Sequence, residues 1–441
     1  MRVALRADEA SGTGHVVRCN SLAAALQERG AETRFVDDAA PADWLVVDHY
    51  GVEPAWETQA RRQAPKILAI DDFGSRRHDC DILVDQNFNP DADARYAALL
   101  PARCRRLLGP RYAILRSEFR KIKAHVRKGT VRHVLVSLGG EDPGNETANA
   151  VKLLKGRGLE VDVVVGAANR HHEEVARLCR DAGFRFHRQA SNMAELMAAA
   201  DLAVGAGGTT TWERCRMGLP TVQLSLAGNQ VGPSRALAEA GLVIYAGASL
   251  TEEPLLRAIG NPGMLKKQSR RLLELVDGQG ARRVAAALFA SASTNLSLRQ
   301  AKPGDARLYF DWANDPEVRR QSFDSRPIAW PEHEAWFARR LEEGTKQDAL
   351  LLVAEDEAGI PAGQVRFERK DAWRVNYALA AEFRGVGLGA KMLGMAIDQL
   401  RRRDPGARLQ AEVKPDNVPS RRIFEALGFR AASPTLFERN A

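Results

Sequence analysis

The chain has 441 residues, and its 45% hydrophobic content is enough to bury the cores of two or three domains. Its longest apolar stretches, such as residues 284–290, are far too short to span a bilayer, and the chain opens directly on a strand-like segment. We therefore expect a cytoplasmic protein with no membrane partner. The formal net charge of +8 suits phosphate-bearing ligands. Basic runs such as Arg401–Arg403 close a predicted helix, which argues against a nucleic-acid partner.

Five cysteines stand singly in the chain, without the C-x-x-C pair that zinc sites and redox motifs use. Their odd number and wide spacing predict reduced thiols rather than a disulfide framework. No other cluster has the spacing of metal ligands, so we expect no bound metal. The five positions are Cys19, Cys80, Cys104, Cys179 and Cys215.

Up to about residue 275, short apolar runs typical of buried strands alternate with helical patterns, which predicts parallel sheets with helices on both faces. A segment rich in Arg and Lys, residues 116–132, interrupts this alternation and divides two α/β halves, 1–130 and 131–290. A polar linker follows at 291–295, and a new pattern fills 296–441. The strand-like runs are 3–5, 45–47, 67–70, 134–136, 161–165, 202–204 and 221–224.

The first strand ends in a loop that contains glycine, and a helical stripe follows, so that His15 falls in the first turn of a helix. The positive end of a helix disfavours an imidazolium ion. A neutral His15 could therefore accept a proton, as a general base must. Taken alone, this local pattern also fits a histidine that only caps the helix or packs locally.

In the second half, the strand 202–204 runs into a glycine-rich turn and then a helix, an arrangement suited to a diphosphate. Thr210 and Glu213 have the T-x-x-E spacing of a capping box, although Glu213 could instead accept the hydroxyls of a ribose. A further loop at 227–230 follows the strand 221–224. Loops of both halves would then face one cleft, where ligands of open parallel sheets bind.

Together with residues 46–51, 70–72, 108–112 and 137–143, these loops resemble PseG, a family of UDP-sugar hydrolases of the pseudaminic acid pathway. The resemblance runs from Val3 to about Ala290. It implies two Rossmann-like halves similar to MurG-type glycosyltransferases of the B class. It also implies inverting hydrolysis in which His15 activates water and Tyr50 and Asn229 assist. Because no metal-ligand cluster is apparent in the sequence, we expect this hydrolysis to be metal-independent. The UDP-sugar would be held by Gly14, Asp48, Gly207, Gly208, Thr209, Thr210, Glu213 and Gln230.

Two motifs mark the last part of the chain. Residues 384–389 read R-G-V-G-L-G between a predicted strand, 375–379, and a predicted helix, 390–401. Free amides at such a junction suit a pyrophosphate, although a tight turn or a dinucleotide site would look alike. The second motif, N-x-x-S-x-x-x-F-E-x-x-G-F from Asn417 to Phe429, follows the strand 409–413.

In combination the two motifs resemble the acetyl-CoA-binding core of the GNAT N-acetyltransferases, which implies an α+β domain over residues 296–434. By this resemblance Ala378 and Leu379 would pair with the pantetheine arm, and Asn417 and Ser420 would line its other side. Asn417 or Ser420 could instead cap a helix. The CoA pyrophosphate would be bound by backbone groups of Arg384, Gly385, Val386, Gly387, Leu388, Gly389 and Ala390.

The proton donor for the departing thiolate is open. Many GNAT relatives place a Tyr where Phe424 stands, and we expect Phe424 and Phe429 to pack in the core instead. This part of the chain has no cysteine, so direct attack of an amine on the thioester is the economical route. The remaining candidates, each of which could be purely structural, are Tyr377, Glu412, Asp416 and His333.

Residues 312–319, W-A-N-D-P-E-V-R, resemble the amine-substrate side of PseH, the sugar-directed GNAT enzymes, but could be a helix end stopped by Asp-Pro. The resemblances together imply acetylation of the 4-amine of a UDP-4-amino-6-deoxy sugar, followed by hydrolysis of the diacetamido product. A B-class glycosyltransferase with an accessory acetyltransferase domain is an alternative, as is a non-catalytic role for one module. The oligomeric state stays open, and a homo-oligomer is compatible with the sequence.

Overall fold

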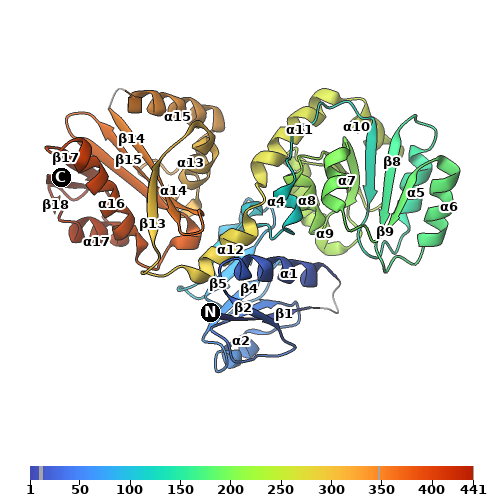
Figure 1. The fold of residues 1–441 in the computed structure, drawn as a ribbon, viewed down its shortest axis with the longest axis horizontal. Coiled ribbons are helices and arrows are strands. Elements are labelled where there is room, and N and C mark those ends of the chain that lie inside the picture. The colour runs from blue at the N-terminus through green and yellow to red at the C-terminus, as the bar shows by residue number, and fades with distance from the viewer. Residues whose placement is uncertain (9–12, 346–347, 441) are drawn as a thin grey trace. The chain divides into compact units, whose positions relative to one another are not determined.

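The computed structural model describes residues 1–8, 13–345 and 348–440, which form two compact units, Met1–Ala285 and Ala286–Ala441 (Figure 1). Residues 9–12 of the first glycine-containing loop lie outside the described residues. In the part that is described, no helix has the length and apolar character needed to cross a membrane.

The first unit begins with a six-stranded parallel sheet in the order β2-β1-β3-β4-β5-β6. Its inner strands are buried on both faces, which explains their continuous apolar sequence. The strands are β1 (Arg2–Ala7), β2 (Glu32–Phe35), β3 (Trp44–Asp48), β4 (Lys66–Ile70), β5 (Ile82–Asp85) and β6 (Arg105–Leu108). The helices are α1 (Thr13–Gln27), α2 (Pro54–Ala60), α3 (Ala92–Tyr96) and the 3₁₀ turn η1 (Pro110–Tyr112).

A second six-stranded parallel sheet has the order β12-β11-β10-β7-β8-β9. Its strands are β7 (His133–Ser137), β8 (Glu160–Val165), β9 (Arg185–Arg188), β10 (Leu202–Ala206), β11 (Thr221–Leu224) and β12 (Ile244–Gly247). Its helices are α5 (Glu146–Leu154), α6 (His172–Ala182), α7 (Met193–Ala199), α8 (Thr210–Arg216), α9 (Gly228–Glu239), α10 (Glu252–Ile259), α11 (Pro262–Leu275) and α12 (Gly280–Phe289).

The basic connection at 116–132 packs against the second sheet's half. It contains the short helix α4 (Glu118–Lys121), and Phe119 is fully buried in the same core cluster as Leu135 and Trp212. Arg127 is also buried, and its guanidinium donates to the carbonyls of Met197 and Ala198 at the end of α7. Part of this charge-rich segment is therefore core rather than solvated linker.

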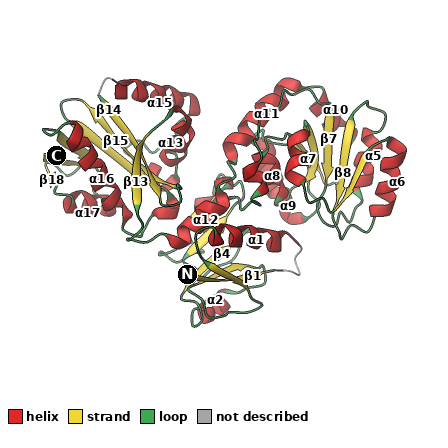
Figure 2. Cartoon of the chain, viewed as in Figure 1, coloured by secondary structure: helices red, strands yellow, loops and turns green. Residues whose placement is uncertain are grey.

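The second unit is a seven-stranded mixed sheet in the order β13-β14-β15-β16-β17-β19-β18, in which only β16 and β17 pair in parallel. Helices lie on both faces of this sheet, and one hydrophobic core joins them to the strands (Figure 2). The elements in order are β13 (Leu296–Gln300), η2 (Pro303–Asp305), α13 (Ala306–Ala313), α14 (Pro316–Gln321), α15 (Trp330–Thr345), β14 (Ala349–Asp356), β15 (Pro361–Arg369), β16 (Trp373–Leu379), η3 (Ala381–Phe383), α16 (Leu388–Arg403), β17 (Arg408–Glu412), α17 (Val418–Ala426), β18 (Arg430–Ala431) and β19 (Leu436–Asn440).

The fold class predicted from the sequence is confirmed: two parallel α/β sheets are followed by a mixed α+β domain. All seven strand-like runs fall within parallel strands, and the predicted helix at 390–401 lies inside α16. All five cysteines are free.

Candidate functional sites

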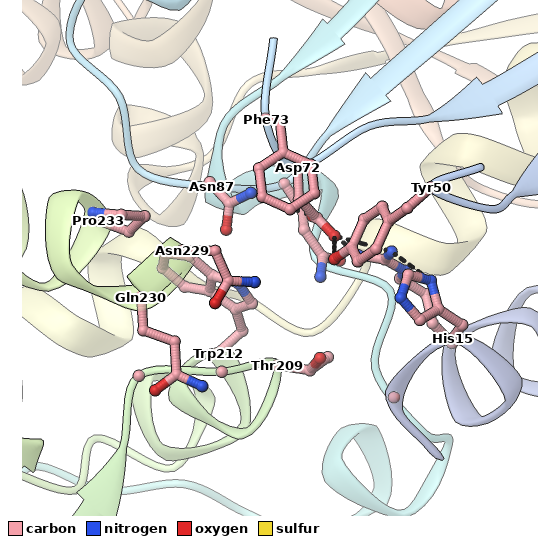
Figure 3. Close-up of a pocket in the computed structure, with 15 residues that line it drawn as sticks. His15, Tyr50, Asp72, Phe73, Asn87, Thr209, Trp212, Asn229, Gln230 and Pro233 are labelled. Atoms are coloured by element: carbon pink, nitrogen blue, oxygen red, sulfur yellow. Dashed lines mark hydrogen bonds and ion pairs between the residues drawn. The ribbon is translucent and has the colours of Figure 1, made fainter. Parts of the chain in front are cut away.

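A cavity of about 220 Å³ opens in the first unit at the carboxyl ends of the strands (Figure 3). Parallel strands direct their following loops to one edge, so loops far apart in sequence meet there. Eight residues predicted for the UDP-sugar site line this cavity: Gly14, His15, Tyr50, Gly207, Gly208, Thr209, Asn229 and Gln230. The other lining residues are Arg18, Asp72, Phe73, Gln86, Asn87, Trp212 and Pro233.

His15 is the third residue of α1, and Asp48, at the end of β3, fixes its orientation. Nδ1 of His15 lies 2.6 Å from Oδ1 of Asp48, and both side chains are buried. The ring also meets the Tyr50 ring edge-on, with centroids 4.5 Å apart. In the tautomer in which Nδ1–H donates a hydrogen bond to Asp48, Nε2 has a free lone pair and can accept a proton.

Asp48 itself is placed differently from the sequence prediction. We expected it among the sugar-binding residues, but it is fully buried behind His15 and is not part of the cavity wall. Burial opposes its charge, yet Arg18 and His15 outweigh burial and lower the pKa of Asp48. Asp48 is therefore a buried carboxylate that contacts His15 and Arg18 and lies outside the cavity wall.

Arg18, which no motif in the sequence marks, links two carboxylates beside the cavity. Its Nε and Nη2 donate to Asp48 at 2.8 and 2.6 Å, and its Nη1 and Nη2 donate to Asp72, both at 3.0 Å. Burial disfavours the cation, but Asp48 and Asp72 raise the pKa of Arg18 well above its ordinary value. Arg18 lies one helical turn after His15, so the i, i+3 spacing was the only signal for it in the sequence.

Asp72 completes this network at the cavity wall. It accepts hydrogen bonds from the Tyr50 hydroxyl at 3.0 Å and from Asn87 Nδ2 at 3.1 Å (Figure 3). Burial and the nearby Asp72 raise the pKa of Tyr50, which keeps it a neutral phenol. Because Asp72 already accepts from Arg18 as well, its position is fixed before any ligand enters.

On the opposite wall, the turn after β10 comes close to its neighbours. A methyl group on Gly207 would stand 2.5 Å from Ser234 Oγ, so any other residue there would force the Ser234 side chain to shift. Gln230 lines the cavity, and its Oε1 accepts from the Leu226 amide at 2.9 Å, which ties down the loop before α9. Asn229, beside it, is exposed to the cavity.

The predicted capping box of Thr210 and Glu213 is wrong. Helix α8 begins at Thr210, its N-cap residue is Thr209, and no side chain caps it. Thr210 Oγ1 instead accepts from Arg214 at 3.2 Å. Glu213 pairs with Arg116 at 3.0 Å, and its other oxygen, Oε2, is buried and meets no hydrogen-bond partner among the described residues. Burial, only partly offset by Arg116, raises the pKa of Glu213.

In the second unit, β16 and β17 part from each other. They pair only at Trp373–Leu409 and Arg374–Gln410, while β17 continues along β19. On its other side β16 stays paired with β15 as far as Leu379. The β17-facing backbone edge of residues 375–379, which includes Ala378 and Leu379, is therefore open.

A glycine-rich junction follows this open edge. Gly385 and Gly387 have φ values of +74° and +85°, and Gly387 caps the 16-residue helix α16. Over the described chain, the amides of residues 385–387 donate to no carbonyl or side chain. The first-turn amides of α16, at Leu388, Gly389 and Ala390, have no preceding turn to bond to. Arg384 is occupied with Leu379 O and Asp315, so its backbone rather than its side chain belongs to this junction.

Across the gap, Asn417 Oδ1 accepts from the Ser420 amide at 3.2 Å and caps α17, which confirms the capping alternative for Asn417. The Ser420 hydroxyl lies 3.0 Å from the Tyr377 hydroxyl. Phe424 and Phe429 are buried and pack with centroids 5.0 Å apart, so their predicted core role is confirmed.

The other proton-donor candidates lie in different settings. His333 is buried among aromatic rings and contacts Ala306 O at 3.0 Å, and burial lowers its pKa. Glu412 and Asp416 are exposed. The segment 312–319 contains a helix break, as one alternative predicted, because Asp315 caps the new helix α14. In the described ranges, no three His, Cys, Asp or Glu side chains group in a way that could hold a metal.

Comparison with known proteins finds similar proteins for both parts of the chain. Residues 295–430 match the model of the acetyltransferase (GNAT) domain. SpsG of Bacillus subtilis, a spore coat polysaccharide biosynthesis protein, is 27% identical over 321 residues, covering 63% of this chain and 94% of SpsG. An uncharacterized protein of Methanocaldococcus jannaschii is 22% identical over 417 residues, which are 88% of this chain and 81% of that protein.

Among solved structures, yncA of Salmonella typhimurium, determined with acetyl-CoA, is 21% identical with a TM-score of 0.29, covering 33% of this chain and 94% of yncA. An aminoglycoside acetyltransferase, AAC(6′)-Ib in complex with coenzyme A, is 18% identical with a TM-score of 0.28, covering 33% of this chain and 95% of that one. The chain thus carries a C-terminal GNAT acetyltransferase domain, and its N-terminal part is related to SpsG.

Proposed function

We propose that the two units catalyse consecutive steps on one nucleotide sugar. The GNAT domain acetylates the 4-amine of a UDP-4-amino-6-deoxy sugar, and the first unit then hydrolyses the diacetamido product to UDP and the free sugar. The observation that carries the second step is His15, which lines a cavity opposite a glycine turn and is bonded to the buried Asp48 behind it. The relationship to SpsG, a polysaccharide biosynthesis protein, supports a nucleotide-sugar substrate.

In the hydrolysis step, His15 Nε2 takes a proton from water as the water oxygen attacks the anomeric carbon. The bond from that carbon to the phosphate oxygen breaks, UDP leaves with the electron pair, and the configuration inverts. Asp48 holds the ring and stabilises the imidazolium that forms. Tyr50 and Asn229, both at the cavity, would position the sugar.

The turn Gly207–Thr209, with Gly14 and Gln230, would hold the diphosphate. Glu213 has one carboxylate oxygen on Arg116 and one buried without a partner. Glu213 is buried and does not line the cavity, so its proposed role requires the ribose to reach past the wall. A buried acceptor left unbonded is costly, and a ribose hydroxyl donating to Oε2 would satisfy it. Thr210 would support the turn through Arg214 rather than through the ligand.

In the GNAT domain, the open edge of β16 and the free amides at 385–390 fit a pantetheine arm and a pyrophosphate. Acetyl-CoA would supply the activated acetyl group there. Ala378 and Leu379 lie on that edge, and Ser420 faces it across the gap. Among the proton-donor candidates we favour Tyr377, because its hydroxyl meets Ser420 in this gap while the others are exposed or enclosed by aromatic rings.

Mass spectrometry of products from a panel of UDP-amino sugars with acetyl-CoA tests the proposal. We expect an acetylated UDP-sugar first and then UDP with a free sugar. His15→Ala should stop at the acetylated UDP-sugar and still bind UDP. Absence of CoA release with every sugar would contradict the first step. UDP release that requires an added sugar acceptor would show a glycosyltransferase instead of a hydrolase.

A further inference from the structure

Arg214 lies directly behind the glycine turn that lines the cavity of the first unit. Its Nη2 donates to Ala206 O at 2.8 Å and its Nη1 to Thr210 Oγ1 at 3.2 Å, so it bonds to residues on both sides of the turn 207–209. A methyl group on Gly205 would stand 2.5 Å from Nη1. The guanidinium can therefore occupy this place only because residue 205 is glycine.

This cation is buried without a carboxylate in ion-pair contact, and Glu213 acts on it only at longer range. Arg214 is 2% exposed, and within the described residues no carboxylate lies within ion-pair distance of it. Its acceptors are all neutral: Ala206 O, Thr210 Oγ1, Thr211 Oγ1 and Gln223 Oε1. The adjacent Glu213 turns to Arg116 instead, and Nε of Arg214 has no acceptor.

Two other cations near this cavity have carboxylate partners. Arg18 pairs with two carboxylates and Arg116 pairs with Glu213. Burial of Arg214, by contrast, lowers its pKa to about 10. A buried charge is costly unless an opposite charge is near, and the position of Arg214 beside the turn leaves the charge of a bound ligand available to supply it.

We propose that Arg214 is the fixed countercharge for the diphosphate of the ligand, acting through the turn without touching the ligand. This rests on the proposed binding of UDP at the turn 207–209. Because the guanidinium is enclosed by protein, its field on the cavity side is screened less than that of a surface cation. It would favour a diphosphate over an uncharged nucleoside, and it would stabilise the charge that grows on UDP as the sugar bond breaks. Arg214 is thus a positioning residue.

Isothermal titration calorimetry with UDP and with uridine tests this inference. The measured quantity is the ratio of the two dissociation constants, which isolates the contribution of the diphosphate. Arg214→Met and Arg214→Gln remove the charge, and each should reduce the preference for UDP about tenfold or more while uridine binds nearly as before. Arg214→Lys keeps the charge and should retain most of the preference.

Arg127 offers a matched control. It is also 2% exposed, and burial likewise lowers its pKa to about 10. Its guanidinium donates to the neutral carbonyls of Met197 and Ala198 and takes no part in the cavity wall. Arg127→Met should lower thermal stability and leave the ratio for UDP and uridine unchanged.

The outcomes separate the inference from the function on which it rests. Failure of the unmodified protein to bind UDP would contradict the proposed function. UDP binding with an unchanged ratio in Arg214→Met or Arg214→Gln would overturn the role of Arg214. If Arg214→Lys lost the preference for UDP as fully as the neutral variants, the role of Arg214 would be purely structural. Gln keeps a hydrogen-bonding group at this position and Met does not. If Arg214→Met fails to fold, the comparison of Arg214→Gln with Arg214→Lys still tests the role of the charge.

Discussion

Oδ1 of Asp48 lies 2.6 Å from Nδ1 of His15, and the same carboxylate accepts two hydrogen bonds from Arg18. The histidine is therefore fixed by a carboxylate that cannot rotate away. Arg18 also reaches Asp72, so the orientation of His15 and the position of the cavity wall depend on one guanidinium.

Asp48→Asn should lower UDP-sugar hydrolysis by about two to four orders of magnitude, because an amide holds the wrong tautomer and cannot stabilise an imidazolium. UDP binding should be retained. The measurement is the rate of UDP release at saturating substrate. Asp81→Asn is the control, because Asp81 pairs with Arg61 away from the cavity and its loss should affect stability only. Equal rates for Asp48→Asn and the unmodified protein would remove Asp48 from the mechanism.

Gly385→Ala should raise the KM for acetyl-CoA about tenfold or more, since a side chain at φ +74° strains the junction whose amides are proposed to bind the pyrophosphate. Gly359→Ala is the matched control for backbone strain. Gly359 has φ +71° in the turn between β14 and β15, and a methyl group on either glycine would meet no neighbour within 4 Å. Both variants should lose about 1 kcal/mol of stability. A similar KM change in both would show that strain, not the amides, is responsible.

Tyr377→Phe should lower kcat for acetyl transfer by about 10²-fold with little change in KM, because it removes the hydroxyl proposed to protonate the thiolate. Burial raises the pKa of Tyr377, so the phenol holds its proton at neutral pH. Tyr309→Phe is the control: that hydroxyl donates to Leu352 O in the core, and its loss should cost about 1 kcal/mol of stability without affecting kcat. The affinity for CoA, measured by calorimetry, should be equal in the unmodified protein, Tyr377→Phe and Tyr309→Phe. An unchanged kcat in Tyr377→Phe would exclude it as the donor.

The stability of the first unit should fall as the pH rises from about 6.5 to 9. Burial opposes the charge of His78, but Asp71 and Glu57 outweigh burial and raise its pKa to about 9. Because this exceeds the value near 6.5 of an unfolded chain, the stabilisation is complete below about pH 6.5 and is lost toward pH 9. It amounts to at most about 3 kcal/mol.

Urea denaturation of the unmodified protein and of His78→Gln at several pH values from 6 to 10 measures this effect. The variant should be less stable at pH 6 and should lose less stability as the pH rises. The Asp71 carboxylate also accepts hydrogen bonds from the backbone amides of Phe73 and Gly74. The loop that carries Phe73 therefore depends on the same carboxylate that pairs with His78. Parallel pH profiles for the two proteins would show that His78 carries no such charge.

The sequence was most informative where glycines follow strands. The junctions at Gly207 and Gly387 were predicted because a backbone that must approach a neighbour or adopt a positive φ favours glycine. Inner strands were visible because both of their faces are buried. The edge strands β2 and β9 are polar and largely exposed, so hydrophobic periodicity does not mark them.

Hydrogen bonds and ion pairs between individual side chains could not be predicted from the sequence. Arg18, Asp72 and Asn87 belong to three different loops or helices, and only the fold brings them together. Asp48 was assigned to the sugar because the sequence could not show that His15 stands in front of it. The expected capping box failed because the backbone at Thr209 is already helical, with φ −54° and ψ −34°, whereas a capping residue usually adopts an extended conformation.

The contact between Gly205 and Arg214 also has an evolutionary consequence. A Cβ at position 205 and the guanidinium of Arg214 cannot occupy the same space, so residue 205 cannot gain a side chain while arginine stays at 214. Homologous sequences that keep arginine at 214 should keep glycine at 205, and those that have lost the arginine should tolerate alanine or serine there. Covariation of these two positions in an alignment would thus trace the history of this packing arrangement.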